Sequence, residues 1–202
     1  EKLPAKFPDN AIQVLRSEDV GPTIGKELTK KAIIAILLSL AGIVMYLWFR
    51  FELPYGVGAL ASLVHDVLFT LGALALTGRE IDLTIVAALL TIIGYSVNDT
   101  IVIFDRVREN LKITRKLSLK EVFNLSINQC LSRTILTSLT VFLVLLSLFF
   151  FGGQVINNFA FALLVGCFAG VYSTVFIASP VVLWWRSLGK GHNSSSLSKA
   201  KV

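Results

Sequence analysis

The chain has 202 residues, of which 54% are hydrophobic and 16% are charged, and its formal net charge is +6. Soluble domains are about 45–50% apolar and about 25% charged, so a soluble domain with this composition would lack the polar residues needed to cover its apolar mass. Lysine and arginine stand between long apolar runs and form no polar face, which excludes a nucleic acid as partner. The composition is that of a polytopic membrane protein.

Residues 1–31 precede the first apolar run. Ile12 and Val14 alternate within Ala11–Leu15 in the manner of a strand. No secretory signal opens the chain, because Glu1 begins a polar segment. We therefore interpret residues 1–31 as the end of an external domain and the lead-in to the first helix, and the chain as a fragment of a longer protein.

Five later stretches are long and apolar enough to span a membrane, since a helix needs roughly 20 mostly apolar residues to cross about 30 Å of hydrocarbon. The last stretch is longer than one crossing needs, so its start is expected at the membrane interface. The runs lack the two-residue alternation of barrel strands, so the predicted fold class is all-α, a polytopic membrane helix bundle over residues 32–185. The five predicted helices are Ala32–Phe49, Gly56–Thr77, Leu83–Phe104, Thr134–Phe151 and Val155–Trp185.

The distribution of lysine and arginine predicts the orientation of these helices. The connection 105–131 is rich in both residues and is therefore expected to be a cytoplasmic basic loop. The tail 186–202 follows two further crossings, so it falls on the same side, and its Gly, Ser and Lys content indicates a disordered segment. By parity, residues 1–31 lie outside, although Lys26, Lys30 and Lys31 go against the rule there.

Two short motifs have structural interpretations. Ser118 and Glu121 have the spacing of a capping box, which predicts a helix starting here. The apolar face of that helix is expected to lie along the membrane surface, ahead of Arg133. Gly166 and Gly170 form a GxxxG spacing, which permits close packing between helices.

Ionisable side chains within membrane spans cost about 2.5–3.5 kcal/mol on insertion scales, so each one needs a reason. Asp66 lies near the middle of the second predicted span, beside His65. Asp99 lies in the third span, about 7–8 Å from its cytoplasmic end. Arg133 stands at the start of the fourth span.

Helical spacing places these groups on polar stripes, which line helix contacts or a wet cavity rather than facing lipid. The stripe on the second span includes Asp66, that on the third span includes Asp99, and that on the fourth starts at Arg133. The members are Ala59, Ser62, Asp66 and Ala73; Thr91, Tyr95, Asn98 and Asp99; and Arg133, Thr137, Thr140 and Ser147.

A proton relay needs a carboxyl group that can both bind and release a proton. Burial disfavours the charged form of a carboxylate, whereas a nearby arginine favours it. Asp99 and Arg133 are expected in the same half of adjacent antiparallel helices, so we predict that they form such a relay, with Tyr95 and Asn98 beside them. The alternative is a permanent ion pair, or an Asp99 that is hydrogen-bonded to Tyr95 and neighbouring hydroxyl groups.

Asp66 and His65 are a second candidate, an accessory relay, which a satisfied packing role explains equally well. The sequence contains no nucleotide-binding loop, no metal-ligand cluster and no nucleophile–base pair. We therefore expect no enzymatic activity, no cofactor and no metal.

One long segment resembles a known family. The run GYSVNDTIVIFDRVREN over Gly94–Asn110 is similar to the signature of the SecD/SecF family of protein-export membrane proteins, and its Asn98-Asp99-Thr100 core is closer to the SecF branch. The resemblance extends to about Trp185. Further matching stretches are Val20–Gly25, Phe49–Glu52, His65-Asp66, Ser132–Thr134 and Thr137–Thr140.

The resemblance implies six spans in each half of the family, with an external domain after the first, so this chain would carry five of the six. The family is related to the resistance–nodulation–division transporters. By resemblance, Asp99 corresponds to the proton-carrying aspartate and Arg133 to its partnering arginine.

The implied function is that of an accessory subunit of the Sec protein translocase, driven by the proton-motive force, in the bacterial cytoplasmic (inner) membrane with a cytoplasmic C-terminus. The implied partners are SecD, the SecYEG channel, a translocating preprotein, other accessory insertase subunits and membrane lipid. Two alternatives remain: a scaffold subunit in which Asp99 only locks helices together, and a small-solute transporter of the wider superfamily.

Overall fold

The computed structural model describes residues 22–114 and 116–198, and the predicted strand at Ala11–Leu15 lies outside them. The prediction of an all-α membrane fold is confirmed, because five helices in this part of the chain are long and apolar enough to cross a membrane. In chain order the elements are α2 (Pro22–Arg50), α3 (Leu53–Leu76), α4 (Leu83–Ile113), α5 (Leu119–Phe151), α6 (Gly153–Ser173), the π-helical turn η1 (Thr174–Ala178) and α7 (Ser179–Ser198).

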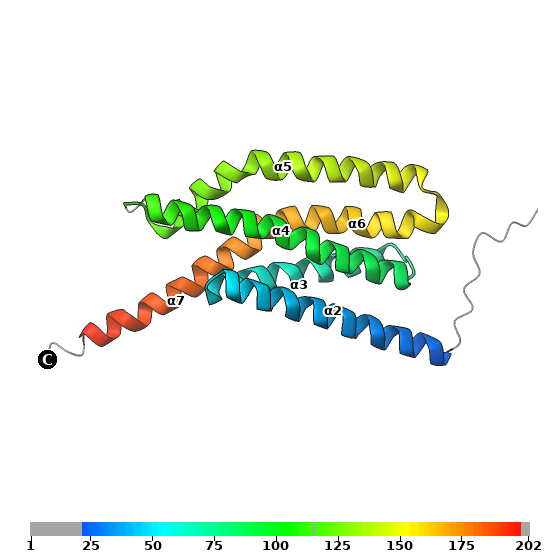
Figure 1. Ribbon diagram of the computed structural model, residues 1–202, viewed down its shortest axis with the longest axis horizontal. Helices are drawn as coiled ribbons and strands as arrows, with labels where there is room; N and C mark the ends of the chain where they lie inside the picture. The colour runs from blue at the N-terminus through cyan, green and yellow to red at the C-terminus, as the bar shows by residue number, and fades with distance from the viewer. Residues whose placement is uncertain (1–21, 115, 199–202) are drawn as a thin grey trace, which may run out of the picture.

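Helix α4 lies at the centre of the arrangement, between α2 and α3 on one side and α5 and α6 on the other (Figure 1). Helix α6 packs against α3, α4 and α5, so α3, α4 and α6 form the interior of the bundle. Helix α2 lies at the edge, in contact with α3 and α4. Polar side chains on the facing surfaces of α3, α4 and α6 are therefore enclosed by protein on every side.

The GxxxG spacing on α6 brings this helix close to α4, as the sequence predicted. A Cβ atom on Gly166 would lie 2.2 Å from Cδ1 of Ile92, and one on Gly170 would lie 3.2 Å from Cβ of Ser96. Ile92 and Ser96 are one turn apart on α4, so two successive turns of the helices are in close contact. Any larger residue at Gly166 would force the Ile92 side chain, or the helix itself, to shift.

Most of the predicted basic loop 105–131 is helical. Helix α4 continues to Ile113 and α5 starts at Leu119, which leaves only the linker 114–118. Arginine, lysine and glutamate are good helix formers, so the charged residues extend the membrane helices rather than ending them. At about 1.5 Å per residue, the 31 residues of α4 span roughly 46 Å, well beyond the hydrocarbon thickness.

The predicted capping box is confirmed at the start of α5. The hydroxyl of Ser118 accepts from the backbone N–H of Glu121, whose carboxylate accepts from the backbone N–H of Ser118. The apolar face at the start of α5 packs against the other helices of the bundle. Val122 and Phe123 are 0% and 1% exposed in an apolar cluster with α3 and α4. The ring of Phe123 stacks on that of Tyr55, with 6.4 Å between the ring centroids.

The last membrane segment is bent rather than straight. The π-helical turn η1 separates α6 from α7, and α7 leaves the bundle at an angle to α6 (Figure 1). Gly58 on α3 allows a close approach here, because a Cβ atom on it would lie 2.7 Å from the carbonyl oxygen of Ala178.

The segment 186–202, which the sequence predicts to be a disordered tail, begins within α7, because this helix continues to Ser198. Extending an existing helix needs no new nucleus, so a polar segment can continue a membrane helix at low cost. Residues 199–202 lie outside the described residues.

Ion pairs and polar contacts join the helices at both ends of the bundle. At the basic end, defined by Arg50, Asp105 and Arg186, the guanidinium of Arg50 pairs with Asp105 at 2.9 Å, and that of Arg186 pairs with Glu52. At the opposite end, Arg79 in the α3–α4 turn donates to the side chains of Asn157 and Asn158 on α6.

Candidate proton-transfer site

Helix α4 presents polar side chains to two different neighbours. Tyr95 and Asp99 lie one turn apart and face α5, while Ser96 and Thr100, also one turn apart, face α3 and α6. Consecutive residues of a helix are rotated by about 100°, so the adjacent pairs 95–96 and 99–100 point in different directions. One segment of α4 therefore takes part in two separate polar clusters.

The first cluster joins α4 to α5 around Asp99. Thr134 donates from Oγ1 to Oδ1 of Asp99 at 2.8 Å, and the hydroxyl of Tyr95 donates to Oγ of Ser138 at 3.2 Å. Thr134 and Ser138 are one turn apart on α5, as Asp99 and Tyr95 are on α4. The two antiparallel helices are thus held in register by two side-chain hydrogen bonds.

The other oxygen of this carboxylate is the least satisfied polar atom of the site. Oδ2 of Asp99 is buried and has no hydrogen-bond partner among the described residues. An unsatisfied buried acceptor costs about 1–3 kcal/mol, more if the group is charged. A carboxyl oxygen in this position is well placed to carry a proton, because protonation removes the charge that the surroundings leave uncompensated.

Arg133 and Asn98 were predicted to belong to this cluster, and the structure places them at its edge. Arg133 is near enough to act electrostatically on Asp99, but it is exposed and forms no ion pair with Asp99 within residues 22–114 and 116–198. Asn98 is exposed too. Asp99 and Tyr95 are therefore brought together through α5, while Arg133 and Asn98 do not touch the carboxylate.

The stripe on α5 that starts at Arg133 was expected to be covered, and it is exposed on the described chain. Each of its hydroxyl groups donates to a carbonyl oxygen three or four residues earlier on α5 itself, so none needs a partner helix. These bonds are Thr137 to Arg133 and Thr134, Thr140 to Thr137, and Ser147 to Leu143.

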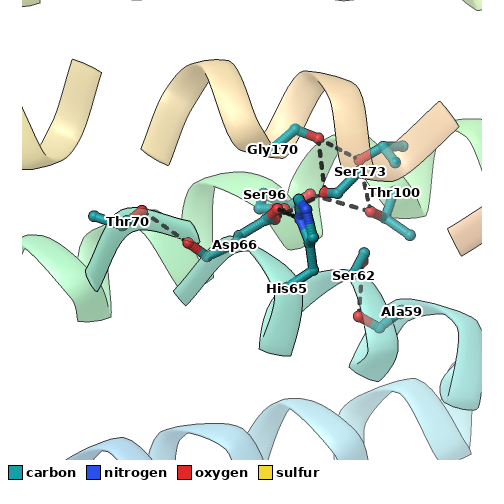
Figure 2. A network of polar contacts seen from close by, with 10 residues as sticks. Ala59, Ser62, His65, Asp66, Thr70, Ser96, Thr100, Gly170 and Ser173 are labelled. Atoms are coloured by element: carbon teal, nitrogen blue, oxygen red, sulfur yellow. Dashed lines mark hydrogen bonds and ion pairs between the residues drawn. The ribbon is translucent and has the colours of Figure 1, made fainter. Parts of the chain in front are cut away.

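The second cluster lies in the interior of the bundle around Asp66, which is 0% exposed. Oδ2 of this carboxylate accepts from Ser96 at 2.6 Å and from Ser173 at 2.9 Å, so the residue joins α3 to both α4 and α6 (Figure 2). Thr100 extends the network, because its hydroxyl lies 3.0 Å from that of Thr174 at the start of η1.

His65 connects this interior cluster to the surface of the bundle. Its Nδ1 lies 3.1 Å from Oδ1 of Asp66, and its side chain is 31% exposed, against 1% for that of Asp66 (Figure 2). The imidazole ring stacks on Phe69 at 5.7 Å and contacts Tyr172 at 6.2 Å between ring centroids. His65 and Asp66 are therefore in contact, and Ser96 and Ser173 donate to the same carboxylate.

Sequence reasoning missed the direct partners of both carboxylates. Thr134 bonds Asp99 where Arg133 was expected to, and Ser173 bonds Asp66 from the last apolar stretch, where no partner for this carboxylate was predicted. Two signals were available: Thr134 and Ser138 repeat at four-residue spacing, and Ser173 with Thr174 interrupts an otherwise apolar run. Within the described residues, no group of three or more His, Cys, Asp or Glu side chains could hold a metal ion.

Residues 2–188 match the family model for the C-terminal part of the protein export membrane proteins SecD and SecF. The chain belongs to the SecD/SecF family. This confirms the resemblance seen in the signature around Asp99.

Two SecF subunits of this family are similar to most of this chain. The protein translocase subunit SecF of Koribacter versatilis is 51% identical over 179 residues, which are 89% of this chain and 44% of that protein. The SecF subunit of Calditerrivibrio nitroreducens is 52% identical over 191 residues, 94% of this chain and 63% of that protein. The chain thus spans less than two thirds of either relative.

A solved structure supports the same assignment. The crystal structure of SecDF, a translocon-associated membrane protein from Thermus thermophilus, superposes on this chain with a TM-score of 0.86 at 45% identity. The match covers 92% of this chain and 26% of that one. The helix arrangement described above is therefore that of the SecD/SecF family.

Proposed function

We propose that this chain is a subunit of the Sec protein translocase that uses the proton-motive force to promote preprotein translocation. Its relatives are named translocase subunits, and SecDF of Thermus thermophilus carries both names in one chain, which supports SecD as the partner. The SecYEG channel, a translocating preprotein, further accessory insertase subunits and membrane lipid are the other proposed partners. The location is the bacterial inner membrane, with the basic end and the C-terminus in the cytoplasm.

The observation that carries this proposal is the state of the Asp99 carboxylate. One oxygen accepts a hydrogen bond from Thr134, and the other is buried without a partner among the described residues. Burial disfavours the charged carboxylate, whereas the Thr134 hydroxyl and the charge of Arg133 favour it. A group between such opposing effects changes its protonation state when water access or the position of the arginine changes.

The membrane potential supplies the energy for such a cycle. Moving one elementary charge across 100 mV is worth about 2.3 kcal/mol, so a few protons per cycle can drive a conformational change. In this account Asp99 carries the proton, Tyr95 and Thr134 hold α4 against α5, and Arg133 moves toward or away from the carboxylate. Asn98, exposed beside Asp99, lies where the proton would enter or leave the site.

A scaffold role is the second candidate, and one observation favours it. The bonds from Thr134 to Asp99 and from Tyr95 to Ser138 fix the register of α4 and α5, which is what a purely structural aspartate would do. In a scaffold, a neutral side chain of the same shape at residue 99 is tolerated, since asparagine still accepts the Thr134 bond through its side-chain oxygen.

The test is gradient-dependent preprotein export by the full-length protein carrying Asp99→Asn, with assembly of the complex checked in parallel. Loss of the gradient-dependent part of export, with assembly intact, supports the proton-driven function. Unchanged export would leave Asp99 as a structural residue. Asp105→Asn is the matched control, because Asp105 lies on the same helix in an exposed pair with Arg50, and such pairs contribute only about 0–1 kcal/mol.

A further inference from the structure

Asp66 is an ionisable residue in the interior of the bundle that the Asp99 site does not use. It is 0% exposed and bonded to α4 and α6 at the same oxygen. We propose that Asp66 is a second proton-binding site whose protonation state is transmitted through Ser173 to the π-helical turn η1, so that proton uptake changes the bend between α6 and α7. This inference rests on the proposed proton-driven function and assigns a responding element to it.

Among the groups that face Asp66, one is titratable, namely His65. His65, on α3 itself, contacts Oδ1 at 3.1 Å, and Tyr172 on α6 contacts the ring of His65. Helix α4 presents Ser96 and α6 presents Ser173, neither of which titrates in this range. Within the described residues, α2, η1 and α7 bring no charged group against this carboxylate.

Ser173 can respond to the charge because it has two acceptors within reach. Its Oγ lies 2.9 Å from Oδ2 of Asp66 and 3.2 Å from the carbonyl oxygen of Gly170 (Figure 2). Hydrogen bonds to an ionised acceptor are roughly twice as strong as those between neutral groups. The charged carboxylate therefore holds the Ser173 hydroxyl, and a neutral carboxyl group releases it to Gly170.

This switch lies where the helical hydrogen-bond pattern changes. Ser173 is the last residue of α6, and Thr174 is the first residue of η1. Thr174 donates to the same Gly170 carbonyl at 2.9 Å and lies 3.0 Å from Thr100 on α4. A single π-helical turn within a membrane helix is frequently a functional feature. When Ser173 competes for Gly170, the bonds that define the start of η1 change.

His65 can pass a proton between the surface of the bundle and the carboxylate of Asp66. The imidazole accepts a proton at Nε2 and transfers the proton on Nδ1 to Oδ1 of Asp66, ending as the neutral Nε2–H tautomer. The reverse sequence returns the proton. His65 is suited to this step because it is the part of the cluster whose side chain reaches the surface, at 31% exposed.

The experiment measures the bend directly, as the distance between spin labels on α6 and α7. The labels replace Phe168 and Trp184, which are 65% and 59% exposed, in the full-length protein within its complex, in lipid, with Cys130 and Cys167 replaced. In otherwise unchanged protein, the distance distribution is expected to shift between two populations as the pH is lowered. Asp66→Asn, which is uncharged at every pH, is expected to show the low-pH distribution throughout.

Ser173→Ala keeps the carboxyl group and removes the link, so its distance distribution is expected not to change with pH. This variant carries the test if Asp66→Asn fails to fold. Ser147→Ala, which removes an exposed serine on α5 bonded only to its own helix, is expected to keep the pH response. The inference would be overturned if the label distance did not change with pH in otherwise unchanged protein. It would also be overturned if the distance still changed with pH in Asp66→Asn or Ser173→Ala.

The same labels separate this inference from the proposed function. Asp99→Asn is expected to stop gradient-dependent export while leaving the pH response between α6 and α7 in place, because Asp99 faces α5. Export that depends on Asp99 with no pH-dependent distance change would overturn the role of Asp66 alone. Export that is indifferent to Asp99 would overturn the proposed function, whatever the labels report.

Discussion

Thr134 donates a 2.8 Å hydrogen bond to Oδ1 of Asp99, and this bond links the residue after Arg133 to the carboxylate on α4. Thr134 is 1% exposed, so the bond is shielded from water. Any movement of Arg133 relative to Asp99 therefore acts on a carboxylate that is already anchored at one oxygen. In the proposed function, the remaining oxygen, Oδ2, takes up the proton.

Thr134→Val is expected to weaken gradient-dependent export about tenfold or more, because a hydrogen bond to a charged group contributes about 1.5–3 kcal/mol. Valine keeps the shape of threonine and removes only the hydroxyl group. Thr134→Ser restores that group, so export should recover with it. If valine and serine behave alike at residue 134, the bond to Asp99 has no part in the cycle.

Arg133→Gln is expected to reduce export strongly while leaving stability within about 0.5 kcal/mol, since Arg133 is exposed and forms no ion pair in the described part of the chain. Arg133→Lys keeps the charge and should retain part of the export activity. Thermal unfolding of the purified variants, measured beside export, separates the two effects. An Arg133→Gln protein that unfolds readily would indicate a structural role.

Gly166→Ala is expected to destabilise the bundle by about 1–3 kcal/mol, as overpacking does, because the new Cβ atom would lie 2.2 Å from Cδ1 of Ile92. Gly94→Ala is the matched control, since no described atom lies within 4 Å of a Cβ atom placed there. Thermal unfolding in detergent gives the comparison.

Ile92→Ala should rescue Gly166→Ala in part, because it removes the side-chain atoms that the new Cβ atom would meet. The double variant is then less destabilised than the sum of the two single variants. Strict additivity would show that Gly166 and Ile92 are not in contact.

Arg79→Ala is expected to lower stability by about 1–3 kcal/mol, because it removes two hydrogen bonds to α6 and a cation–π contact 4.3 Å from the ring centroid of Phe161. Glu80→Ala changes the exposed neighbouring residue and should have little effect. Equal unfolding temperatures for the two variants would mean that Arg79 does not clamp the α3–α4 turn to α6.

The helices were predictable from the sequence because hydrocarbon leaves few solutions for an apolar stretch of some 20 residues. The ends of the helices were not predictable, because hydropathy marks the residues that fit the hydrocarbon layer and not the residues at which a helix ends. Helix α4 continues past Phe104 to Ile113 on charged residues that favour a helix, whereas α7 continues past Trp185 to Ser198 through Gly, Ser and Asn residues that do not. The π-helical turn at Thr174 leaves no mark in hydropathy at all.

The site was predictable as a set of helix positions and not as a set of contacts. Four-residue spacing placed Tyr95 and Asp99 together on α4, and the structure confirms that both bond to α5. The sequence could not say which α5 residue reaches Asp99, because rotating a helix by one residue exchanges Arg133 for Thr134. Nor could it pair Asp66 with Ser173, which lies 107 positions away and meets it only through the packing of α6.

Infrared difference spectroscopy of the full complex in lipid, recorded between two pH values, tests the proton-carrying role of Asp99 most directly. The account predicts a carboxyl C=O band at the lower pH that shifts in D₂O and is absent in Asp99→Asn. Asp66→Asn should retain that band and lose a separate one. A difference spectrum that is the same with and without the Asp99 carboxyl group would contradict the account, because Asp99 would then not change its protonation state.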